Sequence, residues 1–114
     1  MAYTQIMAAA VPTANKDAYL AHAKAAAALF RKHGALSVVE NWGNEVPDGE
    51  MTSFPLAVKC QPDETVVIGW ISWPDKATHD KAWEVMMPEM HKMGEMPFDG
   101  KRMIFGTFDV ILEA

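Results

Sequence analysis

Apolar positions in the first third of the chain recur with the spacings of a strand, a helix and a second strand. Residues 3–11 (YTQIMAAAV) and 36–42 (LSVVENW) are typical of strands, and the second segment alternates between two faces. Between them the sequence predicts a helix that begins at a cap, Thr13 or Asn15, and ends before Gly34. Steps of four, three and four positions give this helix one apolar face, which we expect to be buried: Tyr19, Ala23, Ala26 and Phe30.

A long irregular segment separates this first unit from the clearest strand of the chain. Residues 43–64 contain three prolines and two glycines, which predicts an excursion with turns and a short ordered piece at FPLAVKC. Loops of more than about 15 residues often have a task, such as covering a cleft. Residues 65–73 (TVVIGWISW) then predict a third strand.

The last third of the chain predicts a second helix, a turn and a final strand. The helix spans residues 74–87 (PDKATHDKAWEVMM) with Pro74 at its start, and Pro88 is expected to end or kink it there. The Asp-Gly pair in residues 96–102 (MPFDGKR) predicts a tight reversal before a strand at 103–113 (MIFGTFDVILE).

The order strand, helix, strand, strand, helix, strand is the split βαβ pattern of ferredoxin-like α+β folds. It predicts one domain over residues 1–114, with a four-stranded antiparallel sheet and both helices on one face of that sheet.

The last two strands are apolar on both faces. In the third strand, one face carries Val66, Ile68 and Trp70, and the other carries Val67, Ile71 and Trp73. In the final strand, Ile104, Phe108, Val110 and Leu112 point one way, and Met103, Phe105 and Ile111 point the other. Such strands belong to sheets that are covered on both sides, whereas two helices cover only one.

Leaving the second face in water would be costly. Each large apolar side chain left exposed forgoes about 1.5–3 kcal/mol, so half a dozen amount to about 10 kcal/mol, comparable to the stability of a whole domain. The segment 43–64 supplies part of the cover at most. We therefore predict a homodimer in which two copies pack sheet against sheet about a two-fold axis.

Composition narrows the classes of partner. The chain has 114 residues and a net charge of −5, which argues against a nucleic acid or an anionic membrane as partner. No segment approaches the roughly 20 apolar residues of a membrane span, and the start of the chain lacks the pattern of a signal peptide. Cys60 is the only cysteine, so an internal disulfide and a CxxC motif are excluded, and we expect a reducing, cytoplasmic setting.

The second helix is the best candidate for a ligand-binding surface. His79, Trp83, Met86 and Met90 step by four, three and four positions and so form one stripe. Together with Trp42 and Trp70, the first three of these would line a pocket between helix and sheet, with His79 as acid, base or ligand. The competing interpretation, which we favour, is a core face with one histidine at its edge.

Other candidate chemistry is weaker. Five of the nine methionines lie between residues 86 and 96, but thioethers alone are modest metal ligands, and we interpret them as packing near the dimer contact, with no metal and no cofactor. His22 and His33 are expected to be solvated. Glu40 shares a strand face with Trp42 and would be either an inward-facing acid of raised pKa or, as we favour, a satisfied edge residue.

Residues 96–102 offer one further site. Lys101 and Arg102 beside a glycine would bind an anionic group through charge-assisted hydrogen bonds. The alternative, which we favour because no glycine-rich phosphate loop is present, is a turn in which Asp99 caps backbone amides and Arg102 pairs with a carboxylate.

Several segments resemble one family of proteins. VPDGEMTSFPLAVK (46–59), GWISW, KAWEVMM and above all MPFDGKRMIFGTF (96–108) are similar to the YbaA-like family of small bacterial proteins of unknown function. The resemblance runs through almost the whole chain and implies a ferredoxin-like subunit that pairs into a dimeric α/β barrel. The wider superfamily includes cofactor-free monooxygenases, haem-degrading enzymes and proteins with no known chemistry, so it implies no single activity.

Three functions stay open on the sequence alone. The first is a homodimer that binds a small, mainly apolar molecule without an assignable activity. The second is a cofactor-independent monooxygenase-like enzyme that acts on an electron-rich aromatic, and the third is a purely structural interaction protein. The first two predict a cavity between sheet and helices, and the third predicts a filled core.

Overall fold

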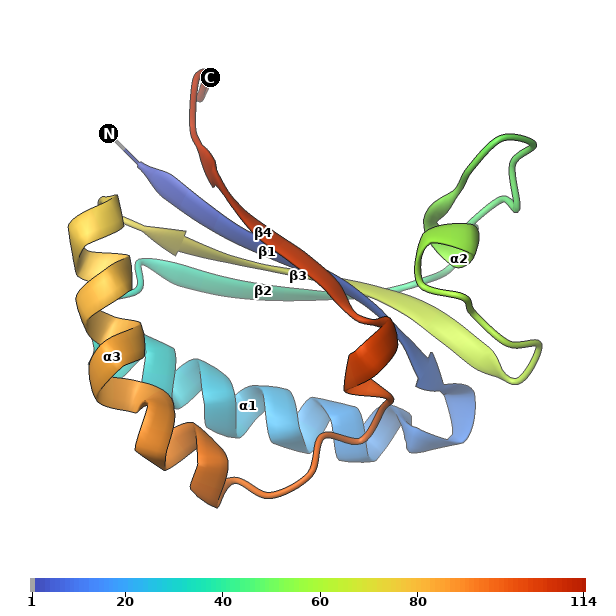
Figure 1. Ribbon diagram of the computed structural model, residues 1–114, viewed down its shortest axis with the longest axis horizontal. Helices are drawn as coiled ribbons and strands as arrows, with labels where there is room; N and C mark the ends of the chain where they lie inside the picture. The colour runs from blue at the N-terminus through green and yellow to red at the C-terminus, as the bar shows by residue number, and fades with distance from the viewer. Residues whose placement is uncertain (1) are drawn as a thin grey trace.

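The computed structural model describes residues 2–114 and has the predicted α+β architecture (Figure 1). A four-stranded sheet has the order β2-β3-β1-β4, with strands β1 (Tyr3–Pro12), β2 (Ser37–Trp42), β3 (Glu64–Trp73) and β4 (Ile104–Asp109). All three neighbouring pairs are antiparallel. The ferredoxin-like fold is therefore confirmed.

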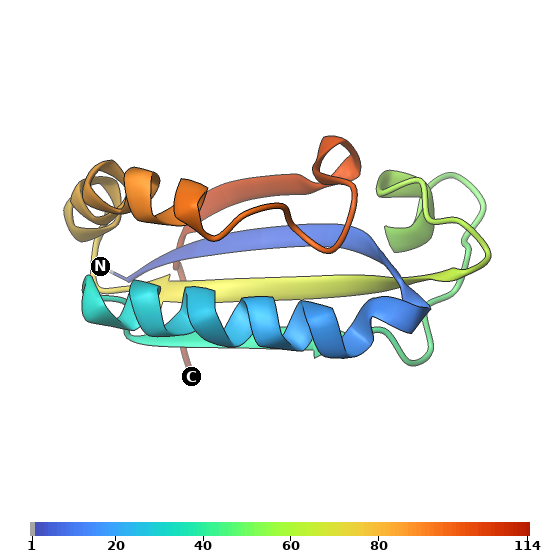
Figure 2. The same ribbon diagram turned by 90° about the horizontal axis from the view of Figure 1, so that it is seen from below.

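The two long helices cover one face of the sheet (Figures 1 and 2). They are α1 (Lys16–Lys32) and α3 (Lys76–Lys92), and the short α2 (Phe54–Ala57) lies on the opposite side. Two 3-10 helices, η1 (Thr13–Asn15) and η2 (Gly100–Arg102), precede α1 and β4. No helix within residues 2–114 combines the length and the apolar character needed to cross a membrane.

The hydrophobic core lies between the sheet and the long helices. The four residues predicted on the buried face of α1 are all buried, at 6–8% exposure. Ala26 and Phe30 pack in one cluster with Trp73 of β3 and Met86 of α3, which are fully buried. Tyr19 and Ala23 pack in a second cluster with Val11 and Val67. Phe30 contacts the Trp73 ring edge-on, at 6.3 Å between centroids, a geometry that aromatic pairs prefer.

Helix α3 differs from the expected one at both ends. Asp75 is its N-cap, and a carboxylate oxygen of Asp75 accepts a hydrogen bond from the Thr78 N–H at 2.7 Å. Of the two outcomes predicted for Pro88, an end or a kink of the helix near residue 87, the end is wrong, because α3 continues to Lys92. Proline removes one N–H from the helical ladder, and Pro88 lies on the exposed side, where water can satisfy the carbonyl that loses its partner.

The last strand is shorter than predicted. β4 ends at Asp109, which pairs with Tyr3, the first residue of β1. Tyr3 is where β1 begins, and one more backbone hydrogen bond follows this pair, from the Val110 N–H to the Ala2 carbonyl. Ile111 and Leu112, predicted in the strand, therefore lie outside the sheet, 91% and 81% exposed.

The segment between β2 and β3 covers only part of the second sheet face. It contains the expected ordered piece, α2, followed by Val58, which is fully buried. Val58 packs on Ala8, Ala10 and Val66 at one end of the sheet. This segment and the end of the chain lie on the side opposite the long helices (Figure 1).

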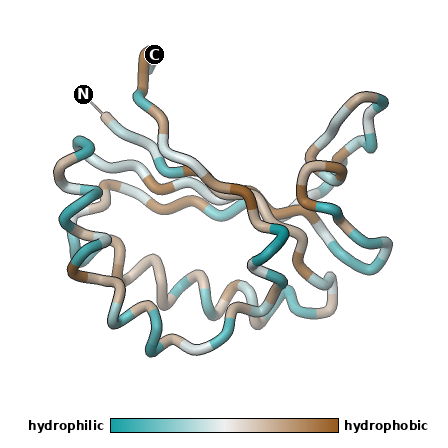
Figure 3. The backbone as a smooth tube through the Cα atoms, viewed as in Figure 1, coloured by the Kyte–Doolittle hydropathy of each residue, from teal (hydrophilic) through white to brown (hydrophobic). Residues whose placement is uncertain are grey.

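The rest of that face is apolar and uncovered. Cross-strand register brings together Ile6 and Trp70, and also Ala8 and Ile104. Trp70, Ile104 and Phe108 are 38%, 47% and 53% exposed. Hydrophobic stretches run along the sheet and reach the end of the chain in Figure 3. The predicted alternation of apolar residues on both faces of β3 and of Ile104–Phe108 is confirmed, and we call Ile6, Trp70, Ile104 and Phe108 the open apolar face.

Candidate functional site

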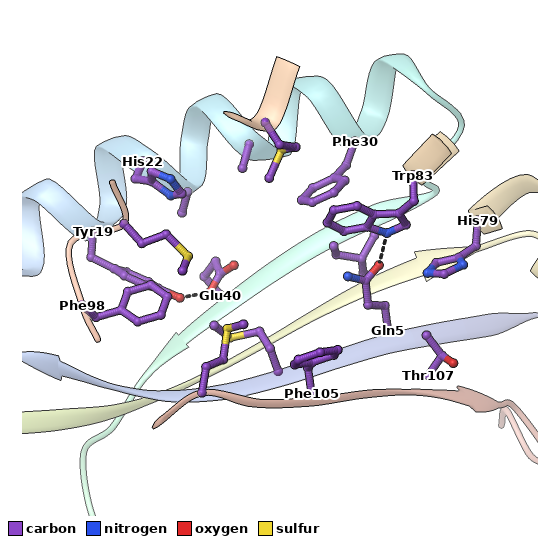
Figure 4. A pocket seen from close by; sticks show the side chains of 18 residues that line it. Gln5, Tyr19, His22, Phe30, Glu40, His79, Trp83, Phe98, Phe105 and Thr107 are labelled. Atoms are coloured by element: carbon purple, nitrogen blue, oxygen red, sulfur yellow. Dashed lines mark hydrogen bonds between the residues drawn. The ribbon is translucent and has the colours of Figure 1, made fainter. Parts of the chain in front are cut away.

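A cavity of about 440 Å³ lies between the sheet and the two long helices. Its floor is formed by all four strands, with β2 contributing Glu40, and its walls by α1, α3 and the segment that joins α3 to β4 (Figure 4). Three small residues, Ala23, Ala26 and Gly69, leave room for it. Its size and largely apolar lining are typical of sites for small organic molecules.

One end of the cavity carries a carboxylate beside a phenol. The Tyr19 hydroxyl of α1 donates a hydrogen bond to Glu40 Oε1 of β2 at 2.5 Å. Glu40 lies over Gly69, its partner on β3, where a Cβ atom would come within 2.7 Å of Oε1. A side chain at this position would displace the carboxylate from its present place beside Tyr19. His22, one turn along α1, lines the same end.

This environment changes the pKa of both partners. Desolvation raises the pKa of Glu40, and the hydrogen bond from Tyr19 and the charge of His22 oppose part of that rise. Burial and the neighbouring carboxylate raise the pKa of Tyr19, which therefore stays a donor. Glu40 is nevertheless accessible from the cavity. Its desolvation therefore comes from the protein atoms around the carboxylate and not from complete burial.

The other end carries polar groups that are already paired. The Trp83 indole N–H donates to Gln5 Oε1 at 2.9 Å. The His79 ring lies edge-on to Tyr3 and Trp73, with centroids 5.3 and 5.6 Å apart. His79 Nδ1 is 2.8 Å from the Asp80 carboxylate. These contacts fix the aromatic wall and leave one edge of His79 toward the cavity.

The structure brings together only some of the residues predicted to form a pocket. His79 and Trp83 line the cavity, whereas Met86 is buried behind its wall. Trp42 lies outside the cavity, next to Tyr19 and beneath the ammonium of Lys16 at 5.4 Å. Trp70 is on the open apolar face.

Two cavity residues lie in positions other than those that we favoured from the sequence. Glu40 faces the cavity rather than a satisfied edge, and His22 lines it instead of being fully solvated. The signal for Glu40 was its alternation with Val38 and Trp42, since all three lie on the helix side of β2. His22 precedes Ala23 on the buried face of α1, and this adjacency was the signal available for it.

Comparison with known proteins identifies the family. Residues 2–100 match the family described as "Protein of unknown function (DUF1428)". The chain belongs to this family. It is 48% identical over 116 aligned residues to the "Uncharacterized protein YbaA" of Escherichia coli K12, an alignment that covers 99% of each chain, and the same values hold for the Shigella flexneri protein. The resemblance to YbaA-like proteins is confirmed.

The methionines of this DUF1428 chain contribute to packing as predicted, since Met86 is fully buried in the core and Met90 and Met93 pack against it. Met90 and Met96 line the cavity, together with Met7 and Met103. These four side chains are on the helix side of the sheet. Their position near a dimer contact stays a prediction. Within residues 2–114, no three His, Cys, Asp or Glu side chains are grouped so that they would hold a metal ion. Thioether side chains adapt to ligands of different shape.

The segment before β4 forms the predicted turn, in which Asp99 caps a backbone amide and Arg102 pairs with a carboxylate. Arg102 donates two hydrogen bonds to the Glu64 carboxylate, at 2.7 and 2.8 Å, and one to Asp99 at 3.1 Å. A fourth hydrogen bond, from Arg102 to the Lys59 carbonyl, joins the turn to the segment after α2. Asp99 also accepts from the Lys101 N–H. The guanidinium of Arg102 is engaged in these contacts, and Lys101 is exposed. These two side chains therefore do not form a preorganised anion-binding site.

We expect Arg102→Met to lower the melting temperature by several degrees at neutral pH. The Arg102 hydrogen bonds hold the pKa of Glu64 below its ordinary value. A carboxyl group of lowered pKa stabilises the fold above its ordinary pKa, and this contribution is lost as the pH falls through the folded value. The difference between wild type and variant should therefore shrink in acid. Melting curves across pH check this, and a gap that does not change with pH would contradict it.

Proposed function

We propose that this chain binds a small, mainly apolar molecule in the cavity between its sheet and its long helices. The observation that carries the proposal is the 440 Å³ volume with aromatic and methionine walls. Unfilled apolar volume of this size costs stability, because the residues that line it lose packing contacts. A core selected only for packing would be filled, so the cavity also counts against a purely structural role.

The cavity wall supplies a site-specific test. The chain has four tryptophans, and Trp83 lines the cavity while Trp70 lies on the opposite sheet face. We expect titration with naphthylmethanol to shift the indole N–H signal of Trp83 in a two-dimensional NMR spectrum and to leave that of Trp70 in place. Equal shifts of both signals would indicate unspecific adsorption, and no shift of Trp83 at the solubility limit would contradict the proposal.

We also propose that the protein acts as a homodimer through the open apolar face. Trp70, Ile104 and Phe108 form a contiguous apolar surface because β3, β1 and β4 are neighbours in the sheet. The α2 region and the end of the chain project on the same side of the sheet as this surface (Figure 1). A second copy related by a two-fold axis presents the same apolar surface, which makes the contact self-complementary.

A second candidate function is a cofactor-independent monooxygenase-like enzyme that acts on an electron-rich aromatic. The observation in its favour is that His79 and Glu40 both face the cavity, where either group is able to accept a proton from a bound substrate. Such a reaction converts an activated CH₂ group and O₂ into a carbonyl group and water, with the substrate as the only reductant. The test measures the rate of O₂ consumption with anthrone as substrate. A rate above the uncatalysed one that is lost in both His79→Gln and Glu40→Gln supports this function. A wild-type rate equal to the uncatalysed rate excludes the function for this substrate.

A further inference from the structure

The residues that line the cavity include a negatively charged side chain but no lysine or arginine. Eighteen residues line it, and among them Glu40 is the only carboxylate, with no lysine and no arginine. The ammonium of Lys16 lies over the ring of Trp42, which is outside the cavity lining. Only two other titratable bases line the cavity, His22 and His79. The cavity therefore holds a carboxylate with no lysine or arginine among the residues that line it.

Glu40 also has unused hydrogen-bonding capacity that points into the cavity. A carboxylate accepts several hydrogen bonds through its two oxygens. Among residues 2–114, the Tyr19 hydroxyl is the only group that hydrogen-bonds it, and it uses Oε1. The partner strand contributes only Gly69 beneath the carboxylate. Within residues 2–114 no group donates a hydrogen bond to Oε2, and Glu40 lines the cavity (Figure 4).

Tyr19 holds this carboxylate in place rather than neutralising it. The Tyr19 ring is buried and lies against Trp42 and Phe98, at 6.3 and 5.8 Å between ring centroids. The segment that carries Phe98 is tied to the start of α1 by a hydrogen bond from the Asn15 side chain to the Pro97 carbonyl. The phenol is therefore fixed, and it orients Glu40 toward the cavity.

We propose that the molecule bound in this cavity carries a protonated amine at one end of an apolar body, and that its ammonium group pairs with Glu40. The inference rests on the proposed function and names the chemical class of its ligand. The ammonium donates to Oε2, Tyr19 keeps Oε1, and the apolar body lies along Phe30, Trp83 and Met90. A charge-assisted contact in a site of low polarity contributes more than the same contact in water.

Three probes with one carbon skeleton test this inference: naphthylmethylamine, naphthylmethanol and naphthoate. With the Trp83 indole signal as readout at neutral pH, we expect the amine to bind at least about tenfold more tightly than the alcohol, and naphthoate to bind most weakly. Glu40→Gln should weaken amine binding by about tenfold and change alcohol binding by less than about twofold. The amine preference should also fall in acid, as Glu40 becomes protonated.

A matched control separates the site from overall charge. Glu84→Gln removes the same charge from the exposed side of α3 and should leave all three affinities unchanged. Melting curves of both variants verify that they are folded. Equal binding of amine and alcohol to the wild type overturns the amine inference and leaves the apolar site standing. Failure of all three probes to shift Trp83 overturns the proposed function and the inference together.

Discussion

Phe108→Glu is expected to convert the protein from a dimer of twice the 12.6 kDa chain mass into a monomer. Phe108 is 53% exposed on the open apolar face, beside Thr4 of the central strand β1. In the proposed dimer the substitution removes a large apolar contact and buries a charge without a partner. The first effect alone amounts to about 1.5–3 kcal/mol per side chain, and it occurs twice in a symmetric interface.

Two copies of this loss raise the dissociation constant by more than about a hundredfold. Sedimentation velocity at micromolar concentration distinguishes the two states. Val85→Glu is the matched control, because Val85 is 52% exposed on α3, on the other side of the molecule. It should leave the dimer intact. A wild-type protein that sediments as a monomer would refute the dimer itself, and dissociation by both variants would refute the location of the interface.

The double variant Ala23→Leu, Ala26→Leu is expected to abolish binding of apolar probes. Both alanines lie on α1 and line the cavity, and two isobutyl groups would occupy the space in which the ligand's apolar body lies. Alanine and leucine have similar helix propensities, so α1 itself should be unaffected. Because the new side chains fill empty volume, we expect the melting temperature to be retained or raised.

The control for this variant uses the same substitutions on the opposite side of the helix. Ala25 and Ala28 have the same spacing and are exposed. Ala25→Leu, Ala28→Leu should retain probe binding as judged by the Trp83 indole signal. If the cavity-filling variant binds naphthylmethanol as tightly as the wild type does, the ligand lies outside this cavity.

Periodicity was sufficient to predict most of the fold. Spacings of three and four residues identified the buried face of α1, and alternation identified both faces of β3. These features depend on local repetition along the chain, which a sequence displays directly. Periodicity did not predict the end of α3 or the end of β4. The effect of Pro88 on α3 depends on which side of the helix faces water, and the end of β4 depends on where the neighbouring strand β1 begins.

The site was harder to predict than the fold. Large aromatic residues were chosen as pocket candidates, but Trp70 follows the parity of Val66 and Ile68 and therefore faces away from the helices. A cavity arises where side chains are small, so Gly69 and Ala23 define its position more directly than any tryptophan does. Their smallness is visible in the sequence, but the empty space above them depends on how α1 and α3 diverge over the sheet.

The cavity and the open apolar face lie on opposite sides of the same β-sheet, one strand thickness apart. Gly69 and Trp70 are consecutive residues, yet one contributes to the floor of the cavity and the other to the outer surface. In the proposed dimer each protomer would therefore keep a cavity of its own, and saturation should require one equivalent of ligand per polypeptide. Affinity measured at different protein concentrations should accordingly be constant, even across the range in which the proposed dimer dissociates.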